Sequence, residues 1–322
     1  MAMRLSTWRR MRSAAAVAIT LSLSLIAAPS LAYSPLGAPR FAAVLMDADT
    51  NEILYEEQGA AIRHPASITK VMTLYLVFDA LASGRLRLDD QVVVSQHAAY
   101  QKPSKLGLAP GRSLSVEDAI QVVAVKSAND IAVALAEKIG GTEANFARMM
   151  TQKARQLGMR QTMFANASGL PDPAHFTSAR DIATLSAALL RNHPNFYRYF
   201  SEQSFAYGRQ RMANHNHLLG NVVGLDGIKT GYTVDSGFTL TASAIRGGRR
   251  LIAVVLGAPS SWSRNRDIIS MLDAGFTALQ ITARGGQSDI RALLSAQGFA
   301  LDRGERPARL MEMQPVEEGD AE

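Results

Sequence analysis

The chain of 322 residues is 47% hydrophobic and 19% charged, and its 34 Lys and Arg residues against 28 Asp and Glu residues give a formal net charge of +6. This apolar content excludes a wholly disordered chain, and 24 Gly with 12 Pro exclude a collagen-like one. Because the chain has no Cys, disulfide scaffolds, thiolate metal sites and cysteine nucleophiles are excluded as well.

The N-terminal segment has the three parts of a secretory signal. Residues 1–12 contain four arginines and no acid, residues 13–28 are almost all apolar or Ser, and Ser30-Leu31-Ala32 supplies small side chains. Pro29 follows too soon for the roughly 20 apolar residues that a membrane-spanning helix requires. We therefore predict a signal peptide over residues 1–32, cleaved near Ala32, and an exported mature chain.

Charge is distributed unevenly along the rest of the chain. Without the four leader arginines, the chain has 30 basic residues (34 minus 4) and 28 acidic ones. The last eleven residues contain five acidic residues and no basic one. We predict a main domain over residues 33–280 and an extension over residues 281–322 that ends in a solvated acidic tail. The body between is mildly basic, without long Lys/Arg runs or interleaved aromatics, so nucleic acid is not expected as a partner.

Hydrophobic patterns predict the remaining elements in chain order. An apolar run at 41–46 and a second one at 52–55 indicate an N-terminal hairpin. The helices that follow are predicted at 67–81, 115–125, 131–139, 146–157 and 178–191, then strands at 225–232, 238–245 and 251–256, and a last helix at 267–279. Gly247-Gly248 indicates a hairpin turn. Strands at both chain ends predict an α+β fold with a mainly antiparallel sheet.

A first candidate site is Ser67-Ile68-Thr69-Lys70. Three residues apart on a helix, the Ser67 hydroxyl and the Lys70 ammonium lie on one face. Lys70 is the only cation in an apolar stretch, so desolvation should lower its pKa toward that of a working base. The alternative is that Ser67 only caps the helix and Lys70 extends to solvent.

Two further short motifs follow. Ser127-Ala128-Asn129, between two predicted helices, offers a second hydroxyl and an amide, although a helix cap explains this triplet equally well by itself. Lys229-Thr230-Gly231, on a predicted strand, offers a cation, a hydroxyl and room for close approach, which suits a peptide carboxylate laid along a sheet edge. An ordinary turn lysine is the alternative there.

Together the three motifs, in this order and at these spacings, are typical of penicillin-recognising serine acyl-transferases. The chain resembles the low-molecular-mass D-alanyl-D-alanine carboxypeptidases, which are serine penicillin-binding proteins, from about residue 40 to residue 276. The matching stretches are residues 65–70, 126–130, 166–170, 214–219 and 227–233. The resemblance implies a β-lactamase/transpeptidase-like fold, a periplasmic location, peptidoglycan stem peptides as substrates and β-lactams as covalent inhibitors, with no cofactor and no metal.

The resemblance also implies roles for the residues of the first two motifs. Ser67 would attack the carbonyl of the D-Ala–D-Ala bond, and Lys70 would take its proton. Ser127, with Lys229 beside it, would pass a proton to the departing D-Ala nitrogen. Asn129 would hold the substrate backbone.

Further implied roles concern the oxyanion hole and the substrate carboxylate. The backbone N–H groups of Ser67 and Tyr232 would form the oxyanion hole. Thr230 and Arg264, which we prefer over Arg266, would bind the terminal carboxylate. Many members have His where this chain has Tyr232, so only the backbone role of this residue transfers.

Several alternatives stay open or are weakened. A DD-endopeptidase that cleaves crosslinks shares all three motifs, whereas a non-catalytic peptidoglycan-binding protein would not need the intact serines and lysines. A class A β-lactamase needs a glutamate for deacylation, and residues 161–191 contain none. His215 and His217 lack neighbouring ligands for a metal. The short stretch 290–294 is too small for a strong membrane anchor.

Overall fold

The computed structural model describes residues 40–303, so the predicted signal peptide and acidic tail lie outside the described residues. The strands are β1 (Ala42–Asp47), β2 (Ile53–Glu57), β3 (Gln91–Val93), β4 (Ser113–Ser115), β5 (Ser204–Tyr207), β6 (Gln210–Ala213), β7 (Leu225–Thr233), β8 (Gly237–Arg246) and β9 (Arg249–Ala258). The α-helices are α1 (Thr69–Ala82), α2 (Gln96–Ala99), α3 (Val116–Gln121), α4 (Asn129–Gly140), α5 (Glu143–Gln156), α6 (Ala179–Asn192), α7 (Ser261–Ala283) and α8 (Ile290–Ala296).

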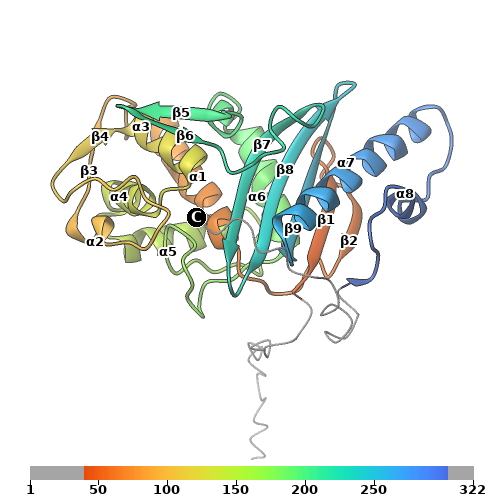
Figure 1. The fold of residues 1–322 in the computed structure, drawn as a ribbon, viewed down its shortest axis with the longest axis horizontal. Coiled ribbons are helices and arrows are strands. Elements are labelled where there is room, and N and C mark those ends of the chain that lie inside the picture. Colours follow the sequence, from red (N-terminus) through yellow and green to blue (C-terminus); the bar gives the residue numbers. More distant parts are fainter. Residues whose placement is uncertain (1–39, 304–322) are drawn as a thin grey trace, which may run out of the picture. The chain divides into compact units, whose positions relative to one another are not determined.

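The main sheet has five strands in the order β2-β1-β9-β8-β7, and every neighbouring pair is antiparallel (Figure 1). β1 pairs with β9, so strands from the two ends of the described chain lie side by side at the centre of the sheet. The predicted α+β class and the antiparallel sheet gathered from both chain ends are confirmed. β7 is an edge strand, which leaves one side of it free to face the helical region.

Both faces of the sheet are covered, and β1 shows how. Ala42, Val44 and Met46 belong to a core that also contains residues of α1, α4 and α6. The alternate residues Ala43 and Leu45 belong to a second core, which they share with α7. Because successive side chains of a strand point to opposite faces, a strand that lies between two cores has no polar face and reads as an uninterrupted apolar run.

The turn between β8 and β9 follows its sequence signature. Arg246 pairs with Arg249, and the two residues between them, Gly247 and Gly248, have φ angles of 56° and 77°. A two-residue hairpin with positive φ at both central positions matches the right-handed twist of its strands, and glycine adopts it without steric cost.

The helices agree with the predicted ones in place but differ at their ends. A 3-10 turn over Ala66–Ile68 precedes α1, whose residues are buried on nearly every face, as predicted. α3 ends at Gln121 and continues as a π-helical turn, Val122–Lys126. α7 begins at Ser261, six residues earlier than predicted, because Ser260 and Ser263 form a capping box.

The C-terminal part of the described chain folds back onto the sheet. α7 extends to Ala283, and Leu294 of α8 is buried in the core that α7 shares with the sheet. Phe299 packs edge-on against Tyr55 of β2, with ring centroids 5.6 Å apart. The first part of the predicted extension therefore packs against the main domain. Within residues 40–303, no helix combines the length and the apolarity needed to cross a membrane.

Candidate active site

Ser67 and Lys70 meet at the start of α1. Ser67 lies in the 3-10 turn and is half-buried, and the Lys70 Nζ lies 2.9 Å from the Ser67 Oγ. The turn places the Ser67 hydroxyl at the N-terminal end of α1, where the helical region faces β7. The i, i+3 spacing thus produces the contact that the sequence predicts.

Lys70 is fully buried, and its ammonium donates to two further acceptors. These are the Asn129 Oδ1 at 2.7 Å and the Ser168 carbonyl at 2.6 Å. Burial holds the pKa of Lys70 well below its usual value, and the nearby charge of Lys229 lowers that pKa further. A buried lysine whose pKa is lowered and whose Nζ lies 2.9 Å from a hydroxyl has the properties of a general base.

Ser127 and Asn129 stand between the π-helical turn and α4. Ser127 adopts the left-handed conformation with φ 62°, and its buried Oγ has no hydrogen-bond partner in the part of the chain that the structure describes. The Asn129 amide donates to the Lys102 and Pro103 carbonyls, at 2.9 and 3.1 Å. Because Lys70 donates to its oxygen, Asn129 already has protein partners at both ends, and its contact with a substrate stays a prediction.

The third motif lies on edge strand β7, directly beside Ser67. A Cβ atom at Gly231 would lie 2.8 Å from the Ser67 backbone nitrogen and 2.7 Å from the Thr239 Oγ1, so only glycine fits there. Thr230 is buried on this strand, whereas Tyr232 is exposed and packs on Phe238, with ring centroids 4.4 Å apart. The motif therefore brings the strand backbone against the nucleophile's N–H group.

Lys229 and Arg264 form a buried cationic pair of side chains at this edge. Burial lowers the pKa of Lys229 to about 7, with a smaller contribution from the charge of Arg264, and burial lowers the pKa of Arg264 to about 10. Arg264 donates only to the Asn265 Oδ1, at 2.8 and 3.1 Å, and no carboxylate of residues 40–303 pairs with it. Two buried basic side chains without a counter-ion among residues 40–303 favour an anionic ligand.

Arg266, two residues further along α7, has a different environment. It is exposed, and its guanidinium lies 4.7 Å from the centroid of the Trp262 ring. Of the two arginines, only Arg264 acts on the pKa of Lys229, which favours Arg264 as the residue that faces the catalytic centre.

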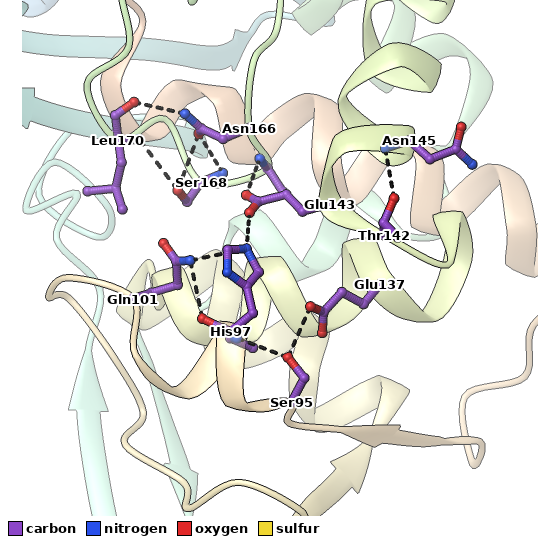
Figure 2. A network of polar contacts seen from close by, with 12 residues as sticks. Ser95, His97, Gln101, Glu137, Thr142, Glu143, Asn145, Asn166, Ser168 and Leu170 are labelled. Atoms are coloured by element: carbon purple, nitrogen blue, oxygen red, sulfur yellow. Dashed lines mark hydrogen bonds and ion pairs between the residues drawn. The ribbon is translucent and has the colours of Figure 1, made fainter.

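The loop at residues 166–170 supplies a contact that sequence reasoning did not assign. Its Ser168 carbonyl accepts from Lys70. The Asn166 Oδ1 accepts from the Ser168 N–H group (Figure 2) and from the Gly169 N–H group. A Cβ at Gly169, whose φ is +84°, would lie 1.8 Å from the Ala66 carbonyl oxygen. A backbone carbonyl has no sequence signature, and the sequence marked residues 166–170 only as one of the stretches that resemble the family.

The two histidines considered as metal ligands lie after β6. His215 and His217 are exposed, and the asparagines that alternate with them, Asn214 and Asn216, are buried. Among residues 40–303, no three His, Cys, Asp or Glu side chains gather closely enough to hold a metal ion.

Comparison with known proteins places this geometry in a family. Residues 37–260 match the family described as D-alanyl-D-alanine carboxypeptidase. The chain is 37% identical over 244 residues to the carboxypeptidase DacF of Bacillus subtilis (73% of this chain, 61% of DacF) and 39% identical over 289 residues to DacD of Escherichia coli (86% of this chain, 74% of DacD). The chain thus spans less than two thirds of the length of DacF. Penicillin-binding protein D2 of Listeria monocytogenes, solved in its cefotaxime-bound form, superposes with a TM-score of 0.67 at 31% identity (73% of this chain, 96% of that chain).

Proposed function

The chain belongs to the D-alanyl-D-alanine carboxypeptidase family, and from this membership we propose that it removes the terminal D-alanine from peptidoglycan stem peptides through an acyl-enzyme at Ser67. The observation that carries the proposal is the fully buried Lys70 with its Nζ 2.9 Å from the Ser67 Oγ. A serine needs an adjacent base to act as a nucleophile, and Lys70 is the titratable side chain in contact with it.

In the acylation step, the neutral Lys70 amine takes the proton of the Ser67 hydroxyl as the Oγ attacks the carbonyl carbon of the D-Ala–D-Ala bond. The lowered pKa of Lys70 favours the neutral amine that this step requires. The negative charge on the carbonyl oxygen would be held by the N–H groups of Ser67 and Tyr232. The close approach of Gly231 to the Ser67 nitrogen supports this placement.

In the departure step, the C–N bond breaks and the D-Ala nitrogen needs a proton. Ser127 is suited to deliver it, because its buried Oγ has no partner within residues 40–303. Lys229, with a pKa of about 7, would resupply that proton. Water then hydrolyses the Ser67 ester and releases the shortened peptide.

Substrate selection would rest on the terminal carboxylate. Thr230 and Gly231 lie on the edge strand, along which an extended peptide can align. Arg264 is a buried guanidinium to which residues 40–303 supply no carboxylate partner. Asn129 would contact the substrate backbone once the peptide displaces one of its present partners. The same site would be acylated by β-lactams, as the cefotaxime-bound relative indicates. We place the enzyme in the periplasm, on the basis of the N-terminal signal.

The proposal is tested with a fluorescent penicillin. The mature protein should give a covalent band on a denaturing gel, and Ser67→Ala should abolish that band. If no band forms, or if the band survives in Ser67→Ala, the acyl-enzyme at Ser67 is ruled out.

D-Ala release from a pentapeptide, measured beside cleavage of a crosslinked dimer, then separates carboxypeptidase from endopeptidase activity. We expect release of D-Ala at the higher rate. Faster cleavage of the dimer would replace the proposed activity by that of a DD-endopeptidase.

A further inference from the structure

Glu143, the first residue of α5, joins the loop beside Lys70 to helix α2. Its Oε1 accepts a hydrogen bond from the Ala167 N–H at 3.0 Å, and its Oε2 lies 2.6 Å from the His97 Nε2 (Figure 2). The Glu143 side chain is only 13% exposed, whereas that of His97 is 58% exposed. One carboxylate thus holds a buried backbone donor on one side and a surface histidine on the other.

The loop that Glu143 holds is the one that contacts the general base. The Ala167 carbonyl accepts from the Thr73 Oγ1 at 2.6 Å, and the next carbonyl, of Ser168, accepts from the Lys70 Nζ at 2.6 Å. Ala167 is therefore fixed at its N–H by Glu143 and at its C=O by α1. Because Ala167 is fully buried, no solvent replaces Glu143 as the acceptor for its N–H group.

Local structure places Glu143 at this point. Thr142 caps α5 by accepting from the Asn145 N–H at 3.1 Å, which sets Glu143 in the first helical turn, where the helix dipole favours a negative charge (Figure 2). Helix α2 is anchored in its turn by Ser95, whose Oγ donates to the Glu137 Oε1 at 3.0 Å. Glu143 and His97 therefore each lie near a helix N-terminus that is held by a capping residue.

We infer that Glu143, oriented by His97, is a positioning residue for catalysis: it holds the loop whose Ser168 carbonyl accepts from Lys70 and so directs the Lys70 Nζ toward Ser67. The inference rests on the proposed function, since it assigns a support to the base of that reaction. Glu143 touches neither Ser67 nor any group assigned to the substrate, so it acts only through the loop.

Loss of the carboxylate has a defined physical consequence. The Ala167 N–H would lack its acceptor, the loop would move to satisfy it, and the Ser168 carbonyl would move away from Lys70. A carbonyl acceptor stabilises the charged ammonium, so its loss lowers the pKa of Lys70 further. A less directed amine also slows proton transfer, because small displacements in a catalytic contact cost rate steeply.

The test measures the rate of acylation by fluorescent penicillin between pH 5 and 9. For Glu143→Ala we expect a rate about tenfold lower at the optimum, by the general cost of misplaced catalytic groups, and an acid limb moved to lower pH. Glu143→Gln keeps an acceptor for the Ala167 N–H and should retain most of the rate. Lys229 and Asp130, the charges that act on Lys70, are untouched by these variants.

Glu137→Gln is the matched control, because it removes a carboxylate from the same network that contacts Ser95 and does not contact the loop. It should keep the wild-type rate and pH profile. If Glu143→Ala does not fold, Glu143→Asp, with its carboxylate withdrawn by one methylene, should show the same direction of change.

Three outcomes overturn the inference. The first is a wild-type rate and pH profile in Glu143→Ala, and the second is a loss of rate in Glu137→Gln equal to that in Glu143→Ala. The third is a lower rate with an unmoved acid limb, because it reports general destabilisation. Absence of labelling in the wild type is distinct from these, because it refutes the proposed function itself.

Discussion

Two arginines are buried at helix α7, and their surroundings differ. Arg303 donates to the Asp267 Oδ2 at 2.8 Å, and its guanidinium lies 4.0 Å from the centroid of the Phe41 ring. The guanidinium of Arg264, one helical turn before Asp267, has a single acceptor among residues 40–303, the neutral amide oxygen of Asn265. Since a buried charge is costly unless it is paired, the first arrangement serves stability, and the second keeps a cation available for a ligand.

The lysines of the site divide in the same way. Lys70 has acceptors from Ser67, Asn129 and Ser168, all within 2.9 Å. Within the described part of the chain, the Lys229 Nζ has one acceptor, the Thr230 carbonyl, at 3.3 Å. The lysine assigned to the base is held by three protein acceptors, whereas Lys229, assigned to proton resupply, has a single long contact within residues 40–303. The comparison therefore predicts which substitutions affect folding and which affect substrate use.

The largest expected effect is on stability, at Arg303. Arg303→Met should lower the free energy of unfolding by about 3–5 kcal/mol, because it leaves the buried Asp267 without its partner. Thermal denaturation measures the loss. Combining the change with Asp267→Asn should recover part of the stability, while the acylation rate per folded molecule stays at the wild-type value. An acylation rate per folded molecule that falls together with stability would contradict a purely structural role of Arg303.

The next effect is on substrate use, at Arg264. Arg264→Met should lower kcat/KM for a peptide that ends in a free carboxylate by about 100-fold, the equivalent of roughly 2.7 kcal/mol for a charged hydrogen bond. A peptide with an amidated C-terminus should lose little. Arg266→Met is the matched control and should leave both substrates unaffected. Equal losses for the two substrates would contradict carboxylate binding by Arg264.

The smallest effect concerns the pH dependence at Lys229. Its pKa falls from 10.5 to about 7 on folding, so between these values the unfolded chain binds more protons and stability rises with pH. Lys229→Met removes this penalty. The variant should be more stable than the wild type at pH 7, because the folded wild type holds the charged ammonium at a cost there, and the gain should shrink toward pH 10. Denaturant titration at both pH values measures it, and a gain that is equal at both would contradict a lowered pKa.

Much of the site followed from local pattern. The spacing of Ser67 and Lys70, the apolar surroundings of Lys70 and the glycine at position 231 each have a local signature, and the structure places them as those signatures indicate. The choice between Arg264 and Arg266 did not follow in this way. Side chains two residues apart on a helix point in different directions, and the sequence does not show which of the two faces the sheet edge.

The contribution of Glu143 and His97 could not be predicted from the chain. Glu143 lies 24 residues before Ala167 and 46 after His97, and one of its partners is a backbone N–H group. Its position in the first turn of a helix is explained by the helix dipole alone. A contact of this kind arises only when helices α2 and α5 and the loop are packed together.

The sequence by itself determined the order of the main-sheet strands and the longer helices, the antiparallel sheet and the three motifs, because periodicity, turn residues and short spacings act over a few residues. It did not predict the short strands β3 to β6 or helix α2. The tertiary structure decided which cations have partners and which do not, how Gly231 meets the Ser67 nitrogen, and which carbonyl receives the Lys70 ammonium. These features depend on distances between segments far apart in the chain, and burial and charge take effect only once the chain has packed.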